Sequence, residues 1–465
     1  MIFPHLLRRL RLATLLLGFV ILCAPQFGSA RPVLMISIDG LRPGDVTDAL
    51  ARGLKVPNLH RFLTDGSYAE GVIGILPTVT YPSHTTLITG AWPARHGIVN
   101  NLTFDPTEIN REGWYYYSSD IKVPTLWDAA HAAHLTTGNI HWPVSVGSPA
   151  IDWNLPQIWM TGHPDDAKLL AALATPGLLA ELQVSEGPYA AGIDDSIEGD
   201  ETRTRFALRL IALHHPDFLT VYLTGLDTIQ HHAGPDTLAA HAVLERLDAA
   251  MGKLVAAEQL VHPDAVVAVV SDHGFAPVTR ALNLWRAFID AGLIRGADAG
   301  PGHGGWKITE WDAVPWISGG SIAVVLAHPD NTALKAKVSD LLVRLKADPA
   351  NGIAAIIGHD EIVKRGGNPQ AEFYLDLADG WMAMPWRGPE LPVVIDPAPY
   401  KGMHGYFPTD PRMRSTLLLM GTGVLKGHDL GLVDMRAIAP TLAQILGVSL
   451  AGAEEPPLAL LAPDH

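Results

Sequence analysis

Three apolar runs that each lead into an acidic residue constrain the fold of this chain more than any other feature. The runs are VLMISIDG (33–40), DFLTVYLTGLD (217–227) and AVVAVVSDHG (265–274). Unbroken stretches rich in branched apolar residues are typical of strands buried on both faces, as in a parallel sheet. Stretches with helical periodicity alternate with them, so we expect an α/β fold, a three-layer α/β/α sandwich around a mostly parallel sheet.

The acidic residues that end these runs predict a site at one edge of the sheet. The carboxyl ends of parallel strands meet at the same edge, and ligands of such sheets bind there. Asp39, Asp227 and Asp272 are therefore expected to lie close together.

Composition changes along the chain and suggests how the fold is divided. Glycine, proline and tryptophan are frequent between residues 281 and 400. We expect residues 31–280 to form the first part of a catalytic core, 281–400 an inserted or cap region, and 401–465 the C-terminal part of the core. With 465 residues, 48% of them hydrophobic, the chain can bury a core of this size.

Residues 1–30 predict a secretory signal peptide. A cluster of arginines precedes an apolar run (13–23) that is too short to span a bilayer comfortably, and a small-residue cleavage site ends at Ala30. We expect cleavage after Ala30 and export to the periplasm or the medium, with an uncleaved anchor as the alternative. No stable membrane span is expected after cleavage.

Loss of this leader changes the charge and the cysteine count. The net charge goes from −15 to −18, because the leader carries three arginines and no acidic residue, and the only cysteine, Cys23, is removed. Without cysteine the mature chain has no disulfide and no thiolate chemistry. We do not expect an exported chain with this much negative charge to bind nucleic acid as a partner, because that binding depends on lysine and arginine side chains that neutralise the phosphates.

The stretch PTVTYPSHTTLITG (77–90) is expected to be a turn that leads into a short helix. Thr80 lies where that helix should begin, and a threonine there commonly caps the free N–H groups with its hydroxyl. The same position can present the hydroxyl to an anion, because helix N-termini bind phosphate. Both interpretations of Thr80 are open at this point.

Six side chains form a candidate set of metal ligands: Asp39, Asp227, His231, Asp272, His273 and His404. Each alone is ordinary, since an acid after a strand often caps a helix. Together they match the mixed oxygen and nitrogen ligands of catalytic zinc. Six are too many for one tetrahedral ion and suit two ions in one site. Metal coordination would also activate the weakly nucleophilic Thr80 hydroxyl, which indicates phosphoryl transfer.

The ordered motifs identify a family resemblance. IDG, PTVTYPSHTTLITG, HGIVNN, YLTGLDTIQHHAGP, SDHG and HGYFP follow one another along the chain. This set resembles the alkaline phosphatase superfamily, and within it the nucleotide pyrophosphatase/phosphodiesterase (type I phosphodiesterase) family. The resemblance covers most of the chain after residue 33.

The resemblance implies two Zn²⁺ ions and a role for each motif residue. Asp227, His231 and His404 would bind one ion, and Asp39, Asp272 and His273, completed by Thr80, the other. Thr80 would attack phosphorus to form a phosphothreonine that water then hydrolyses. Asn101 would hold a non-bridging phosphate oxygen, and Tyr81 would stack on a base or ring of the substrate.

The motifs also bear on the type of substrate. Relatives that prefer monoesters carry a Lys-x-Arg pair, whereas the comparable stretch here, HWPVSVG (141–147), has no lysine or arginine. This favours an exported hydrolase of phosphate diesters, either nucleotides or phospholipid head groups, because a dianionic monoester needs more positive charge. The alternatives are a phosphomonoesterase or phosphonate hydrolase of the same superfamily, and a non-catalytic metal-binding envelope protein on this scaffold. The oligomeric state is left open.

Overall fold

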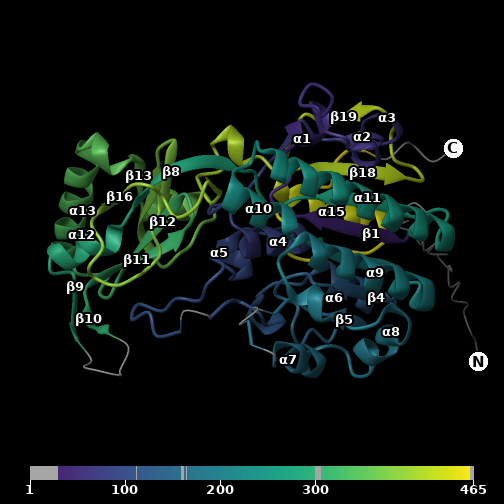
Figure 1. Ribbon diagram of the computed structural model, residues 1–465, viewed down its shortest axis with the longest axis horizontal. Coiled ribbons are helices and arrows are strands. Elements are labelled where there is room, and N and C mark those ends of the chain that lie inside the picture. Colours follow the sequence, from purple (N-terminus) through teal and green to yellow (C-terminus); the bar gives the residue numbers. More distant parts are fainter. Residues whose placement is uncertain (1–29, 111–112, 159–161, 164, 299–304, 461–465) are drawn as a thin grey trace, which may run out of the picture.

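The computed structural model describes residues 30–110, 113–158, 162–163, 165–298 and 305–460, so the expected signal peptide lies almost entirely outside the described residues. A central sheet organises the larger part of the molecule (Figure 1). In spatial order its strands are β19 (His428–Asp429), β2 (Ser67–Tyr68), β18 (Leu417–Gly421), β7 (Val266–Val270), β1 (Val33–Ile38), β6 (Phe218–Leu223), β4 (Thr137–Ile140) and β5 (Trp153–Leu155). Strands β7, β1, β6, β4 and β5 are parallel, and β18 runs antiparallel to β7. The predicted mostly parallel sheet is confirmed.

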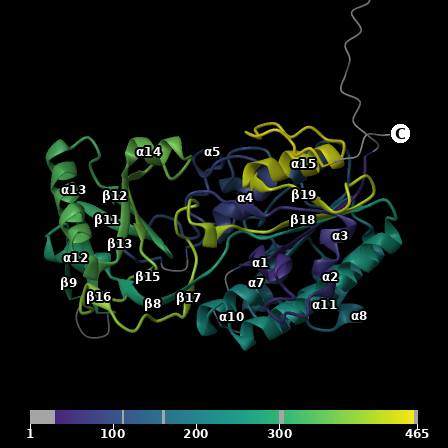
Figure 2. The ribbon, with the colours of Figure 1, turned by 90° about the horizontal axis from the view of Figure 1, so that it is seen from above.

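Alternate residues of the central strand β1 enter two different cores, which is why the fold has three layers. Leu34 and Ile36 pack with one cluster and Val33 and Met35 with another, and all four are fully buried. The first cluster includes helices α7 (Asp166–Leu173), α8 (Leu178–Glu186), α9 (Ile197–His214) and α11 (Leu238–Val261), and the second α4 (Thr80–Thr89), α6 (Leu126–Ala132) and α15 (Ile438–Ile445). Figure 2 shows α4 and α15 on one side of the sheet and α11 on the other.

Shorter elements connect the strands of the central sheet. They are α1 (Gly44–Thr47), α2 (Pro57–His60), α3 (Phe62–Asp65), β3 (Gly71–Ile73), α5 (Pro93–His96), α10 (Gly225–Ala233) and β20 (Leu432–Asp434). Within residues 57–65, α2 and α3 are two short helices separated by Arg61.

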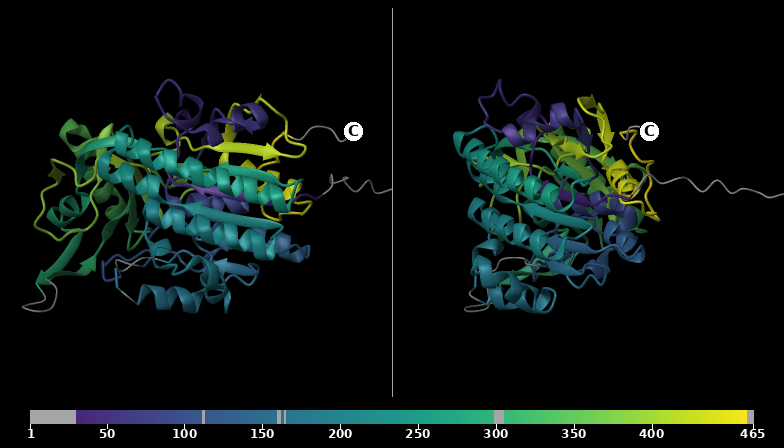
Figure 3. Two further views of the ribbon diagram at one scale, coloured as in Figure 1. Left: turned by 45° about the vertical axis from the view of Figure 1, so that its right-hand side comes forward. Right: turned by 90° about the vertical axis from the view of Figure 1, so that its right-hand side faces the viewer.

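A second sheet, which is antiparallel, lies beside the central sheet at one end of the molecule (Figures 1 and 3). It consists of β11 (Ala313–Ser318), β12 (Ser321–Leu326), β14 (Ala371–Leu377) and β13 (Ile353–Gly358), and its neighbours are α12 (Leu284–Asp290), α13 (Thr332–Ala347), α14 (His359–Lys364) and the pair β9 (Ile294–Asp298) and β10 (Trp306–Trp311). These elements form a hydrophobic core of their own. We call this part the second lobe; its status as an insertion remains a prediction.

One long strand connects the two parts. β8 (Ala276–Leu282) follows the Asp272-His273 turn and pairs with β15 (Gly380–Ala383), β16 (Val394–Ile395) and β17 (Gly402–Met403). His404 comes directly after β17, so the pairing of β17 with β8 returns the chain from the second lobe to the edge of the central sheet.

Candidate active site

Two neighbouring strands of the central sheet and the helix α10 position most of the predicted ligands. Asp39 follows β1 directly, and Asp272 and His273 lie just beyond β7, the strand paired with β1. Asp227 differs from expectation, because β6 ends at Leu223 and this acid lies in the first turn of α10.

The first group of ligand atoms is fully enclosed. His273 Nε2 lies 3.4 Å from Asp39 Oδ1 and 3.1 Å from Asp272 Oδ2. The three side chains are buried, and their ligand atoms all lie within 4.8 Å of one another. This is the spacing of a metal-binding cluster.

The second group adjoins the first. Asp227 Oδ1 lies 3.4 Å from His231 Nε2 and 3.7 Å from His404 Nε2. The rings of His404 and His273 stack with centroids 3.6 Å apart, and the compact cluster in this group is Asp227, His273 and His404. His273 thus belongs to both clusters, whereas His231 contacts the second through Asp227.

The three imidazoles are oriented in the same way. Nδ1 of His231, His273 and His404 lies 3.0, 3.1 and 3.2 Å from the carbonyl oxygens of Gly402, Gly274 and Thr78 respectively. A carbonyl only accepts, so Nδ1 carries the proton and Nε2 presents its lone pair to the carboxylates. Protein histidines that bind metals are commonly held in this way.

Four buried ligand atoms have no hydrogen-bond partner among the described residues: Asp39 Oδ1, Asp227 Oδ1, Asp272 Oδ2 and His273 Nε2. Burial of unpaired carboxylate oxygens is costly unless a cation compensates them. The atoms that lack partners are those that converge, so the residues present fit a bound metal.

The electrostatics of the cluster favour the same conclusion. Burial and the neighbouring Asp272 charge raise the pKa of Asp39 well above its usual range. Burial and the adjacent His273 lower the pKa of His404 to about 3, so its imidazole is neutral and able to bind a metal. A cation here would relieve the repulsion between the carboxylates.

Thr80 is the first residue of α4, and its capping role is not borne out. Val79 is the N-cap, and no side chain caps the helix. Thr80 is 8% exposed and lines the same cavity as Asp39 and Asp227. One turn along, the His84 ring lies 2.9 Å from both the Thr80 carbonyl oxygen and Ser37 Oγ, which anchors this end of the helix to β1.

Asn101 is joined to the same helix end. The Tyr81 backbone N–H donates to Asn101 Oδ1 at 2.8 Å. The Asn101 backbone N–H in turn donates to Asn100 Oδ1, and Asn100 Nδ2 donates to the carbonyl oxygen of Ile317 in the second lobe. With its oxygen engaged, Asn101 retains its Nδ2 donor beside the first turn of α4.

A cavity of about 380 Å³ opens in front of these groups. Its lining includes Asp39, Thr80, Tyr81, Trp114, Gln157, Asp195, Tyr222, Thr224, Asp227, Thr228, His231, His232 and Tyr400. Tyr81 packs edge-on against Trp114 at 5.1 Å and is almost fully buried. His232 lies on α10 next to His231 and is exposed at the rim of the cavity.

Tyr222 and Asp195 are among the lining residues that were not predicted from the sequence. The Tyr222 hydroxyl donates to Asp39 Oδ2, whereas Asp39 Oδ1 has no hydrogen-bond partner among the described residues. Asp195 adds a carboxylate that belongs to neither ligand cluster. Tyr222 lies inside the apolar run of β6, and Asp195 lies in an acidic turn, so neither carries a recognisable signal.

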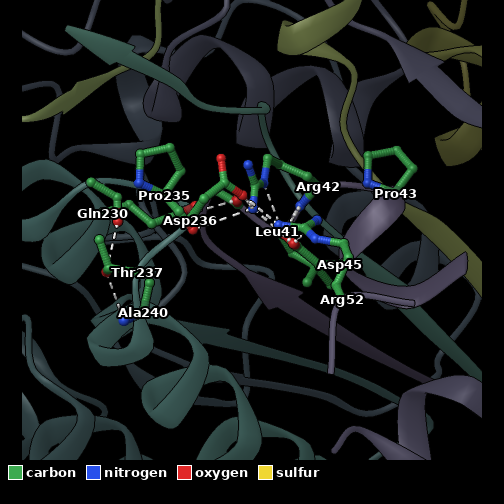
Figure 4. A network of polar contacts seen from close by, with 12 residues as sticks. Leu41, Arg42, Pro43, Asp45, Arg52, Gln230, Pro235, Asp236, Thr237 and Ala240 are labelled. Atoms are coloured by element: carbon green, nitrogen blue, oxygen red, sulfur yellow. Dashed lines mark hydrogen bonds and ion pairs between the residues drawn. The ribbon is translucent and has the colours of Figure 1, made fainter. Parts of the chain in front are cut away.

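A charged network fixes the two sides of the site relative to each other (Figure 4). Arg42, just after the Asp39 turn, binds Asp45 at 2.8 Å and Asp236 at 2.9 Å, and Arg52 contacts the same two carboxylates. Asp236 follows α10, the helix that carries Asp227 and His231. Nearby, Gln230 Nε2 of α10 donates to the Gly40 carbonyl oxygen at 3.0 Å.

The second lobe holds His404 in place. The Gly320 N–H donates to the His404 carbonyl oxygen at 2.7 Å, and the Ser321 hydroxyl donates to the Gly405 carbonyl oxygen. Gly405 has φ +85°, and a Cβ there would lie 1.9 Å from the Ser318 carbonyl oxygen. Only glycine permits this close approach of the β11–β12 hairpin to the loop that carries His404.

Comparison with known families matches the chain to type I phosphodiesterase / nucleotide pyrophosphatase over residues 33–407. An uncharacterized pyrophosphatase/phosphodiesterase of Schizosaccharomyces pombe is 27% identical over 54% of this chain and 46% of its own length. The venom phosphodiesterase of Macrovipera lebetinus is 26% identical over 53% of this chain and 26% of its own length. The human bis(5'-adenosyl)-triphosphatase ENPP4 is 23% identical over 90% of this chain and 78% of its own length. The chain thus spans less than half the length of the first two relatives.

Solved structures show the same fold. Human ectonucleotide pyrophosphatase/phosphodiesterase 5 superposes with a TM-score of 0.63 at 18% identity, covering 90% of this chain and 96% of that one. The murine protein, solved as an inactive variant in complex with AMP, has the same score over 93% and 100%. No helix in the described ranges is long and apolar enough to cross a membrane.

Proposed function

The chain belongs to the type I phosphodiesterase / nucleotide pyrophosphatase family, and from that premise we propose that it is a two-zinc hydrolase of phosphate diesters. The observation that carries the proposal is the convergence of four unpartnered, buried ligand atoms, two of them on Asp39 and Asp227, which line the same cavity as Thr80. Asp39, Asp272 and His273, with Thr80, would hold one ion. Asp227, His231 and His404 would hold the other.

Thr80 is the nucleophile in this proposal. Its position at the start of α4, where it does not cap the helix and lines the cavity, supports attack of Oγ1 on phosphorus. One alcohol of the diester would leave, and the phosphothreonine intermediate would keep the other as an ester. When bound, the ions supply the Lewis acidity that favours the alkoxide and stabilises charge on the leaving oxygen. Water then hydrolyses the phosphothreonine.

Asn101 and Tyr81 position the substrate. Because Asn101 Oδ1 is engaged by the Tyr81 N–H, its Nδ2 can donate to a non-bridging phosphate oxygen near Thr80. Tyr81 and Trp114 supply an aromatic wall for a base or ring. The names of the relatives, among them a bis(5'-adenosyl)-triphosphatase, and the AMP complex support nucleotides as the substrates to test first.

Export belongs to the same proposal. The arginine cluster, the short apolar run and the small residues before Arg31 support removal of residues 1–30. Expression of the full chain in a bacterial host, followed by fractionation and intact-mass measurement, tests it. A periplasmic or secreted product that begins at Arg31 is expected, and a full-length product in the membrane fraction would favour an anchor.

The catalytic proposal is tested on purified mature protein. We expect zinc-dependent hydrolysis of bis-(p-nitrophenyl) phosphate, about two zinc ions per chain by elemental analysis, and loss of turnover in Thr80→Ala. Thr89→Ala is the matched control, since Thr89 lies on the same helix with its hydroxyl bonded to the Thr85 carbonyl oxygen, outside the lining of the cavity.

A trapped intermediate identifies the nucleophile directly. Rapid acid quench during turnover of bis-(p-nitrophenyl) phosphate should give a peptide containing residues 77–90 that is heavier by one p-nitrophenyl-phosphoryl group, because only one of the two p-nitrophenolates has left. Full activity in Thr80→Ala would refute the nucleophile assignment. Bound zinc without turnover of any diester would instead indicate a non-catalytic metal-binding protein.

A further inference from the structure

A carboxylate that no ligand cluster uses lies in the wall of the active-site cavity. Asp195 precedes α9 and lines the same cavity as Thr80 and Asp227. Its side chain is 34% exposed, so it can act on a bound substrate. Neither metal cluster includes it.

The buried neighbours of Asp195 do not cancel its charge. Arg203 is fully buried and donates to Asp200 Oδ1 and Thr224 Oγ1 at 2.7 Å and to the Asp194 carbonyl oxygen at 2.6 Å. Its contact with Asp195 Oδ1 is longer, at 3.5 Å. Two carboxylates thus share one guanidinium, and Asp200 has the closer contact.

The other neighbour of Asp195 is neutral. His141 Nε2 lies 3.9 Å from Asp195 Oδ1. Burial and the Arg203 charge lower the pKa of His141 to about 4, so the ring carries no charge at neutral pH. Burial tends to raise the pKa of Asp195, but His141 and Arg203 more than offset this, and the carboxyl is ionised. Asp195, Asp200, Arg203 and His141 together therefore carry one net negative charge.

The rest of the wall adds no compensating cation in the described part of the chain. The lining contains no lysine or arginine, and its histidines are His231, which faces Asp227, and His232 at the rim. The positive charge near a substrate in this cavity would therefore come from the metal ions that the ligand clusters would hold.

We propose that Asp195 is a specificity-determining residue that disfavours phosphate esters carrying a second negative charge. This inference rests on the proposed function and names the residue that enforces its diester preference. A phosphomonoester carries nearly two charges at neutral pH and a diester one. Repulsion scales with the product of the charges, so the monoester is penalised more.

The test compares two esters that share a leaving group. We would measure kcat/KM for p-nitrophenyl phosphate and bis-(p-nitrophenyl) phosphate at saturating zinc and pH 8. Asp195→Asn should raise the monoester-to-diester ratio on the order of fivefold, the effect of one charge at cavity distance. Asp195→Glu should keep the wild-type ratio, and so should Asp194→Asn, which alters a neighbouring acid outside the lining.

Ionic strength supplies a readout that a merely structural role would not move. Salt screens a partly exposed charge, so the wild-type ratio should rise between low and high salt, and the rise should be weaker in Asp195→Asn. Zinc content and circular dichroism of each variant check folding. If Asp195→Asn does not fold, the salt response of the wild-type ratio and the ratio in Asp195→Glu still test whether the charge of Asp195 sets the preference.

The outcomes separate this inference from the function beneath it. Absence of turnover of either ester by the zinc-loaded wild type would refute the proposed function, and this inference with it. Diester turnover with an unchanged ratio in Asp195→Asn, or a wild-type ratio insensitive to salt, would overturn the role of Asp195 alone.

Discussion

Glu258 is a buried acid whose cost to stability can be worked out from its surroundings. It lies near the end of α11 with no exposed surface, and neither carboxylate oxygen has a hydrogen-bond partner among the described residues. Burial, followed by the charge of Asp217, raises its pKa from the ordinary 4.5 to about 7. The folded protein therefore prefers the neutral carboxyl.

The sign of the pH dependence follows from this pKa. The stability contributed by the protonated group is complete below pH 4.5 and is lost as the pH rises through about 7. Above pH 7 the loss amounts to about 3 kcal/mol, since one pKa unit is worth about 1.4 kcal/mol. Glu258→Gln cannot ionise at this position, so the variant should not lose this stability as the pH rises.

Urea unfolding at several pH values measures the effect. Glu258→Gln should exceed the wild type in free energy of unfolding by about 1 kcal/mol at pH 5 and about 3 kcal/mol at pH 9. Glu245→Gln, on the same helix, controls for the loss of one charge. A difference that does not grow with pH would refute the reasoning, because it would mean that Glu258 ionises in the folded state as it does in the unfolded chain.

Three further predictions concern the site. Gly405→Ala places a Cβ against the Ser318 carbonyl oxygen, so zinc content and activity should fall at least about tenfold while far-UV circular dichroism is retained; normal zinc binding would contradict the role of the hairpin. Asn101→Ala should lower kcat/KM for the diester about 10²-fold or more, and an unchanged value would exclude the phosphate contact. Removal of metal by a chelator should lower Tm, because the buried carboxylates then repel one another; zinc should restore it, and an unchanged Tm would argue against a preformed metal site.

The sequence predicts the central sheet and the convergence of several candidate ligands because each depends on local patterns. The run 33–38 is apolar at nearly every position, which only a strand buried on both faces requires, and β1 has that place. Asp39 and Asp272 follow such runs, so their meeting at one edge follows from parallel pairing.

Other features depend on contacts that no local pattern records. Tyr222 looks like one more core residue in FLTVYL, and its hydroxyl has a purpose only once Asp39 lies opposite. Thr80 has the residue type of a cap, yet the backbone places Val79 at that position. Asp227 follows an apolar run like the others, but the helix α10 begins before it.

The contact between the β11–β12 hairpin and the His404 loop limits how the second lobe can be altered. A lobe joined only by flexible linkers could be exchanged between homologous proteins as a module. Here Gly320 and Ser321 bond directly to the backbone of His404 and Gly405. A graft that replaces this hairpin removes the support of the proposed ligand His404, whereas the far end of the lobe, around β9, β10 and α13, makes no such contact with His404 among the described residues. Chimeras should therefore be cut so that residues 318–321 stay with the central sheet.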